Sequence, residues 1–173
     1  MLGLVLATLV CFGDSVTFGV GVESPDRTFC EMLGGINKGV PSEDTREALV
    51  RFQDDVLSER PDTVIIMFGL NDSLSLALSD YRANLRYMVK KLQRRGINVI
   101  LMTPNATARP WMEELTGPYV RTVRRLGERL GVPVVDVHRA FKRSEDIRLL
   151  LDADEAHPNG AGHRVIYRSI KAL

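Results

Sequence analysis

The sequence has almost no net charge, few aromatic residues and only two cysteines. Its 173 residues carry 23 Lys and Arg against 22 Asp and Glu, and only 6% are aromatic. This charge balance gives no indication of nucleic acid or an anionic membrane as a partner. Two cysteines, Cys11 and Cys30, do not make a disulfide framework in a chain of this length. Cys11 lies in an apolar run, so we expect a buried thiol there.

Motifs of several common enzyme classes are also missing. The chain has no Gly-x-Ser-x-Gly segment, which disfavours an ordinary α/β-hydrolase. It has no phosphate-binding glycine loop followed by lysine, and no Gly-x-Gly-x-x-Gly after an apolar run. No His and Cys residues have the spacing of metal ligands. We therefore expect no cofactor and no metal.

Long apolar runs are confined to the N-terminus. Residues 1–11 are apolar but lack the basic start of a signal peptide, and they run directly into Gly13-Asp14-Ser15. We interpret them as the first strand, with extra residues in front. No other stretch approaches the ~20 apolar residues that a membrane span requires. The length suits one domain, residues 1–173, and we expect a cytoplasmic protein without a membrane span.

Short apolar runs alternate with amphipathic helical patterns along the chain. This alternation is typical of a parallel sheet with helices on both faces. Strands are expected at 4–12, 36–41, 63–68, 97–102 and 132–137. Helices are expected at 25–33, 44–59, 81–95, 111–130 with an interruption or a kink at Gly117-Pro118, 139–143, 146–151 and 160–173. The predicted fold is a three-layer α/β/α, flavodoxin-like domain with a five-stranded parallel sheet in the order 2-1-3-4-5.

Polar residues that could perform chemistry follow two of the predicted strands. Ser15 comes after the first strand and Asn71 after the third, and these strands would be neighbours in this order. His157 could serve as the base that a serine nucleophile needs, because Asp154 lies three residues upstream and could orient the imidazole. Plainer roles are open for each: a strand-to-helix cap around Ser15, a turn for Asn71 and a helix N-cap for Asp154.

The remaining candidates favour structural roles. His138 and His163 have no carboxylate at a helpful spacing on a loop, and we expect ordinary packed or exposed side chains. Asp72 is interpreted as an anchor of its loop. Glu155 competes with Asp154 for His157, but a separation of two residues does not place it beside the imidazole.

Three segments together resemble the GDSL/SGNH hydrolases. They are residues 13–15 (Gly-Asp-Ser), 69–72 (Gly-Leu-Asn-Asp) and 154–158 (Asp-Glu-Ala-His-Pro). The resemblance covers nearly the whole chain and implies an esterase, lipase, thioesterase or carbohydrate acetylesterase on a flavodoxin-like sheet. By position it implies Ser15 as nucleophile, His157 as base and Asp154 as orienting acid. It also implies an oxyanion hole formed by the N–H of Ser15 and the side chain of Asn71.

The fourth segment of the family departs from its pattern in this chain. Residues 37–44 place Ser42 where the family has a glycine whose N–H completes the oxyanion hole. A serine keeps the N–H, but it fits poorly if the loop needs a positive φ.

The expected reaction is hydrolysis of small carboxylic esters, with short acyl chains, through an acyl-enzyme on Ser15. Side chains that could line an acyl pocket, or simply pack the core, are Leu74, Leu76, Leu78, Trp111 and Met112. Within the family, a carbohydrate acetylesterase, a thioesterase and a lysophospholipase are open alternatives. Outside it, the alternative is a non-catalytic flavodoxin-like binding module.

Overall fold

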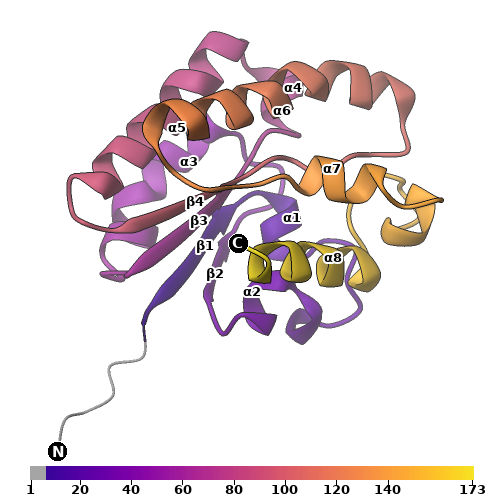
Figure 1. The fold of residues 1–173 in the computed structure, drawn as a ribbon, viewed down its shortest axis with the longest axis horizontal. Coiled ribbons are helices and arrows are strands. Elements are labelled where there is room, and N and C mark those ends of the chain that lie inside the picture. Colours follow the sequence, from indigo (N-terminus) through magenta and orange to yellow (C-terminus); the bar gives the residue numbers. More distant parts are fainter. Residues whose placement is uncertain (1–6) are drawn as a thin grey trace, which may run out of the picture.

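A five-stranded parallel sheet forms the centre of the molecule, in a computed structural model that describes residues 7–173 (Figure 1). The strands are β1 (Leu9–Gly13), β2 (Ile36–Gly39), β3 (Thr63–Met67), β4 (Asn98–Met102) and β5 (Val134–Val135). Their order is β2-β1-β3-β4-β5 and every neighbouring pair is parallel, so the predicted flavodoxin-like fold is confirmed. In register, Gly13 lies beside both Gly39 and Met67, so three strands end together at one edge.

Two helical layers cover the sheet. One layer consists of α3 (Thr45–Phe52), α5 (Leu78–Gln93) and α6 (Pro110–Leu130); the other contains α2 (Phe29–Met32), α7 (Val137–Lys142) and α8 (Gly160–Lys171). The short helices α1 (Ser15–Phe18) and α4 (Asp72–Ser75) follow β1 and β3 directly. Single turns of 3₁₀ helix lie at Pro25–Arg27 and Ile147–Leu150.

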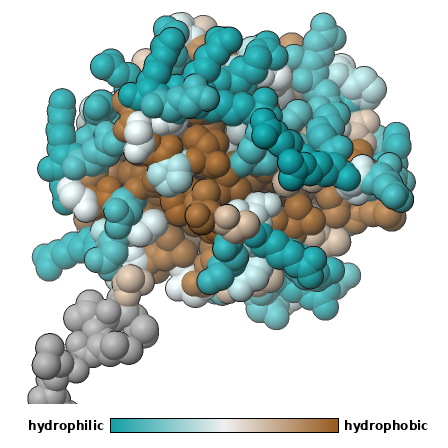
Figure 2. All heavy atoms as spheres, in the orientation of Figure 1, coloured by the Kyte–Doolittle hydropathy of each residue, from teal (hydrophilic) through white to brown (hydrophobic). Residues whose placement is uncertain are grey.

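Alternating strand residues supply the two cores, one on each face of the sheet. Phe12 and Ile66 pack with the α3, α5 and α6 side chains, whereas Cys11, Ile65 and Met67 pack with those of α2, α7 and α8. This alternation is the period of two that a strand imposes on its side chains. Figure 2 shows the result from outside: hydrophilic side chains cover both helical layers, and apolar atoms are visible in a band between them.

Several element boundaries differ from the sequence-based expectation. Helix α3 begins after Asp44, as expected, with a complete capping box to Glu47. It then continues as a π-helical segment, Gln53–Leu57, which has no signal in the apolar pattern. Helix α6 runs without interruption through Pro118, so an interruption at this position is wrong. The residues that follow the proline, Tyr119, Val120 and Val123, are buried against the core.

The ends of the sheet also differ from expectation. Strand β1 begins at Leu9, and the part of the predicted first strand before Ala7 lies outside the described residues. Strand β5 is only Val134–Val135 because Asp136 already caps α7 with its side chain. Among residues 7–173, no helix combines the length and apolarity needed to cross a bilayer.

The expectation for the cysteines is wrong. Cys11 on β1 and Cys30 on α2 form a disulfide with their Cα atoms 6.0 Å apart, so Cys11 is not a free thiol. Both side chains are fully buried in the core that β1 shares with α2 and α8. Counting cysteines could not reveal this pairing, because it depends on how α2 packs against the sheet.

Candidate active site

The turn from β1 into α1 presents Ser15 at the carboxyl edge of the sheet. Asp14 caps α1 by accepting a hydrogen bond from the Val16 N–H at 3.0 Å. Gly13 makes the sharp turn possible: a Cβ there would lie 2.0 Å from Thr17 Oγ1 and 2.5 Å from the Met67 carbonyl oxygen. Ser15 is therefore the first helical residue, with its side chain at the edge where open α/β sheets bind ligands.

Ser15, His157 and Asp154 form one hydrogen-bonded chain. His157 Nε2 lies 2.8 Å from Ser15 Oγ, and His157 Nδ1 is hydrogen-bonded to Asp154 Oδ2. Asp154 Oδ1 also accepts the backbone N–H groups of Ala156 and His157, both at 2.9 Å. Burial raises the pKa of Asp154, but these hydrogen bonds outweigh it and hold the pKa below its ordinary value. The aspartate is thus a charged acceptor that fixes the imidazole.

The segment that carries His157 is a non-helical turn. Glu155 has a φ of 58° and pairs with Arg148 at 2.9 Å, away from the imidazole. The loop after β4 supports this turn: Asn105 Nδ2 donates to the Ala156 carbonyl at 2.9 Å. On the other side, Gly21 has a φ of 92°, and a Cβ there would lie 3.3 Å from His157 Cβ. Close packing on both sides therefore fixes the position of the imidazole.

Three hydrogen-bond donors come from the neighbouring strand ends. Asn71 Nδ2 donates one N–H to the Glu43 carbonyl at 3.0 Å, and a side-chain amide carries a second N–H. Within residues 7–173, the backbone N–H groups of Ser15 and Ser42 have no hydrogen-bond acceptor. Ser42 has a φ of 65°. The loop does adopt the left-handed conformation that the family's glycine suits, and the serine occupies it.

Arg51 connects these segments, and the sequence analysis did not identify it. Its Nε donates to both carboxylate oxygens of Glu43, at 2.8 and 2.9 Å. Its two Nη atoms donate to the Lys38 carbonyl at 3.0 Å and the Gly13 carbonyl at 3.3 Å. The guanidinium also pairs with Asp55 at 2.8 Å. One partly buried cation therefore links the ends of β1 and β2 to the loop that contains Ser42.

Two buried carboxyl groups lie beside the donors. Burial raises the pKa of Asp14 to about 7 and that of Asp72 to about 6, although hydrogen bonds oppose the shift in both cases. Asp72 Oδ1 accepts from the Thr45 N–H at 2.9 Å and from the Thr45 hydroxyl at 2.5 Å. These bonds attach the α4 start to the α3 start, as expected of a loop anchor.

The other candidate residues lie apart from this hydrogen-bonded chain. His138 Nε2 lies 3.2 Å from Glu113 Oε2, a carboxylate distant in sequence, and His163 is fully buried against Phe29. Among the suggested pocket residues, Leu74, Leu78 and Trp111 are exposed, Leu76 is partly buried and Met112 is buried. No group of His, Cys, Asp and Glu in the described part of the chain could hold a metal ion.

Comparison with known proteins identifies the family. Residues 11–165 match the model of the GDSL-like lipase/acylhydrolase family. An acetylxylan esterase from Geobacillus stearothermophilus is 30% identical over 78% of this chain and 68% of its own length. The uncharacterized lipoprotein YqeF of Bacillus subtilis (strain 168) is 27% identical over 94% and 87% of the two chains. The cytoplasmic location expected from the sequence is not confirmed, since this relative is a lipoprotein.

A solved structure agrees with the family match along the whole fold. The lipase/acylhydrolase from Enterococcus faecalis superposes with a TM-score of 0.83 at 28% identity, covering 96% of each chain. The matched residues 11–165 contain β2 to β5, most of β1 and all of the hydrogen-bonded chain from Ser15 to Asp154. The chain belongs to the GDSL-like lipase/acylhydrolase family and is a carboxylic ester hydrolase.

Proposed function

We propose that the protein hydrolyses small carboxylic esters by two-step acyl transfer, with Ser15 as nucleophile, His157 as base and Asp154 as the acid that orients it. The observation that carries this proposal is the 2.8 Å contact between His157 Nε2 and Ser15 Oγ, with Asp154 on the opposite ring nitrogen. A serine hydroxyl is a weak nucleophile unless a base is within this reach.

The steps balance with these groups and one water. His157 Nε2 takes the hydroxyl proton as Ser15 Oγ bonds to the ester carbonyl carbon. When the tetrahedral intermediate collapses, the alcohol leaves with the proton from His157, and the acyl group stays on Ser15. His157 then takes a proton from water, whose oxygen attacks the acyl carbon, and the acid departs as the proton returns to Ser15 Oγ. Asp154 keeps the imidazole in one tautomer throughout.

The negative charge that develops on the carbonyl oxygen requires hydrogen-bond donors fixed in advance. We assign this role to the Ser15 N–H, the Ser42 N–H and the Asn71 side chain. The two backbone N–H groups have no acceptor within residues 7–173, and Asn71 is held by the Glu43 carbonyl. The left-handed φ of 65° at Ser42 supports its assignment, because the loop takes the conformation expected of the family's glycine.

Short acyl groups are the proposed substrates, and acetyl esters are the first to test. Support comes from the acetylxylan esterase that is 30% identical to this chain. Rates on p-nitrophenyl acetate, butyrate and octanoate, measured in one assay, test the preference. We expect kcat/KM to fall as the acyl chain lengthens.

The nucleophile is tested by Ser15→Ala. Loss of a triad member typically costs on the order of 10⁴-fold or more in rate, and we expect that loss for p-nitrophenyl acetate. A fluorophosphonate should label the wild-type protein at Ser15 and leave the variant unlabelled. Labelling of both proteins, or unchanged hydrolysis by the variant, would show that another group attacks the ester. Absence of labelling and hydrolysis in the wild type would favour the alternative of a non-catalytic binding module.

A further inference from the structure

Cations form two rows on the outer surface of the α5–α6 layer. Along α5 and its C-terminal end the row is Arg82, Arg86, Lys90 and Arg94, each four residues after the last. Along α6 the row is Arg121, Arg125 and Arg129, with the same spacing. Four residues of helix advance by ~6 Å, so each row repeats a positive charge at about that interval along its helix.

A groove between the two helices collects cations from both rows. Arg82, Arg86 and Lys90 of α5 and Arg129 of α6 line one hollow of about 630 Å³, whose floor includes Leu126 and Leu130. Arg125 lines the adjoining hollow together with Arg82 and Arg129. We call these two hollows the α5–α6 groove. All five cations are exposed.

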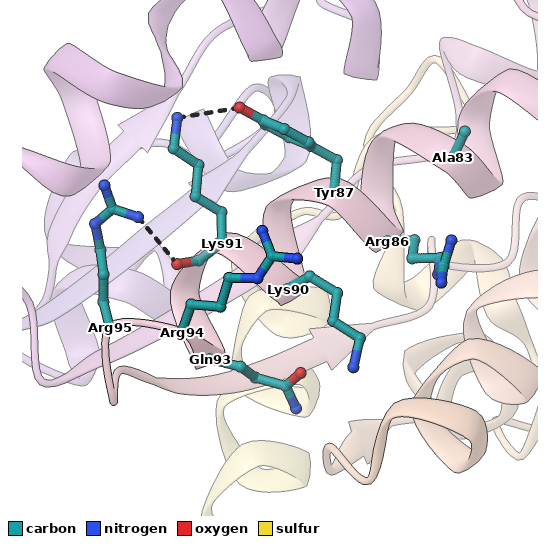
Figure 3. Close-up of a pocket in the computed structure, with 8 residues that line it drawn as sticks. All are labelled: Ala83, Arg86, Tyr87, Lys90, Lys91, Gln93, Arg94 and Arg95. Atoms are coloured by element: carbon teal, nitrogen blue, oxygen red, sulfur yellow. Dashed lines mark hydrogen bonds between the residues drawn. The ribbon is translucent and has the colours of Figure 1, made fainter.

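The arrangement on α5 separates these cations from their basic neighbours. In Figure 3, Arg86 and Lys90 extend from one side of the helix, whereas Lys91 and Arg95 extend from the other. Lys91 Nζ donates to the Tyr87 hydroxyl at 3.1 Å, and Arg95 donates to the Lys91 carbonyl at 3.3 Å. Lys91 and Arg95 therefore have partners within α5, and the groove side does not.

The groove cations form no ion pair in the described part of the chain. None of the five forms a salt bridge or a side-chain hydrogen bond within residues 7–173, and no Asp or Glu lines the two hollows. Like charges four residues apart destabilise a helix by ~0.2–0.5 kcal/mol for each pair. This chain has a net charge of only +1, so the accumulation is local and does not reflect a basic composition.

We propose that the α5–α6 groove binds a linear phosphate-bearing polymer. Charge complementarity requires an anionic partner, and the groove favours an extended chain over a flat surface because cations stand along both of its sides. Four of the five groove cations are arginines, whose planar fork suits phosphate oxygens. Successive phosphates along an extended chain can contact cations of both rows, because each row repeats its charge along its helix.

This site does not depend on ester hydrolysis, and it can be tested on the intact protein with an end-labelled long-chain inorganic polyphosphate. Five neutralised cations predict a salt slope of about −3.5 in log K against log salt, or about a 10²-fold loss of affinity from 50 to 200 mM salt. The groove variant Arg86→Gln/Arg125→Gln/Arg129→Gln should reduce the slope to about −1.4 and weaken binding at least ~10-fold at 50 mM salt.

The matched control removes the same charge from the opposite helical layer. The control variant is Arg164→Gln/Arg168→Gln/Lys171→Gln, three exposed positions on α8. It should bind polyphosphate as the wild type does, and thermal unfolding of both variants should confirm that they fold. Equal losses in both variants, or no binding at 50 mM salt, would overturn the proposal. Vesicles of phosphatidylglycerol and phosphatidylcholine test the alternative partner, a membrane surface. Binding to these vesicles that the groove variant loses, without binding to polyphosphate, would refute a polymer site.

Discussion

Arg51 offers the sharpest test of how the fold positions the proposed oxyanion donors. Its guanidinium holds the Glu43 carboxylate and the carbonyls of Gly13 and Lys38, and the Glu43 carbonyl in turn accepts from Asn71. The Arg51 side chain is 17% exposed and that of Glu43 only 9%. Replacing Arg51 with Met removes the guanidinium's bonds to Glu43, Gly13 and Lys38 and leaves the nearly buried Glu43 carboxylate without its cation.

The cost of this change can be bounded. Removing one partner of a buried ion pair costs ~3–5 kcal/mol, whereas an exposed pair is worth ~0–1 kcal/mol. The ion pair of Arg51 is partly exposed and so lies between a buried and an exposed pair. We therefore expect Arg51→Met to lower the free energy of unfolding by about 2–3 kcal/mol. Arg51→Lys keeps the charge but loses the fork, and we expect about half of that loss. A shift of the Glu43 loop would also move Asn71, so kcat/KM should fall by about 10- to 100-fold.

Urea unfolding and p-nitrophenyl acetate hydrolysis measure the two effects separately. Glu43→Gln in the Arg51→Met background should recover part of the lost stability, because no unpaired carboxylate remains. The control is Arg46→Met, since the Arg46 side chain is 64% exposed in its pair with Asp44 and its removal should cost under ~1 kcal/mol. If Arg51→Met unfolds at the same urea concentration as Arg46→Met, the reasoning about this partly buried cation is wrong.

Three further predictions follow from individual positions. Ser42→Gly should stabilise the protein by about 0.5 kcal/mol in urea unfolding and leave kcat/KM within about twofold. Glycine relieves backbone strain of ~1–2 kcal/mol at the φ of 65°, and this gain exceeds the entropy cost of glycine. Destabilisation by this substitution would contradict the strain argument. Gly21→Ala should lower kcat/KM by more than ~10-fold, because the new Cβ displaces His157. The control is Gly34→Ala: Gly34 has a φ of 69°, but no atom lies within 4 Å of the new Cβ, so this substitution should affect stability alone. Burial lowers the pKa of His163 from 6.5 to about 4. The neutral imidazole therefore contributes to the stability of the folded state above pH 6.5. This contribution, about 3 kcal/mol, is lost as the pH falls toward 4. The difference in unfolding free energy between the wild type and His163→Gln should shrink over that pH range, and a constant difference would argue against a buried neutral imidazole.

Features that depend on local sequence were predictable. The strand order and the Asp44 cap follow from apolar periodicity and from capping preferences at single positions. Ser15, Asn71 and the Asp154–His157 pair were identifiable because each lies in a short motif that follows a strand or precedes a helix. Ser15 and Asn71 converge because the strands of the parallel sheet end at a common edge, whereas His157 reaches that edge from the turn before α8.

Features that depend on packing between distant elements were not predictable. Arg51 looks like any helical arginine in the sequence, and its importance arises only when α3 packs over the ends of β1 and β2. Asn105 supports the turn before His157 from the loop after β4, a contact between residues 51 positions apart. The rows of cations on α5 and α6 look like ordinary solvated helix surfaces in the sequence, because periodicity within one helix does not reveal which helix lies beside it.

The bond between Cys11 and Cys30 encloses the proposed nucleophile in a covalent ring. The two cysteines are 19 residues apart, and the ring contains Ser15 as well as Gly21, which packs against His157. Closing a ring of this size restricts the unfolded chain and is worth ~3 kcal/mol of stability in the chain-entropy model. Such bonds persist in oxidising surroundings and are reduced in most cytosols. The protein should therefore unfold at a lower temperature in a reducing compartment than in an oxidising one, although Ser15, His157 and Asp154 are the same in both compartments.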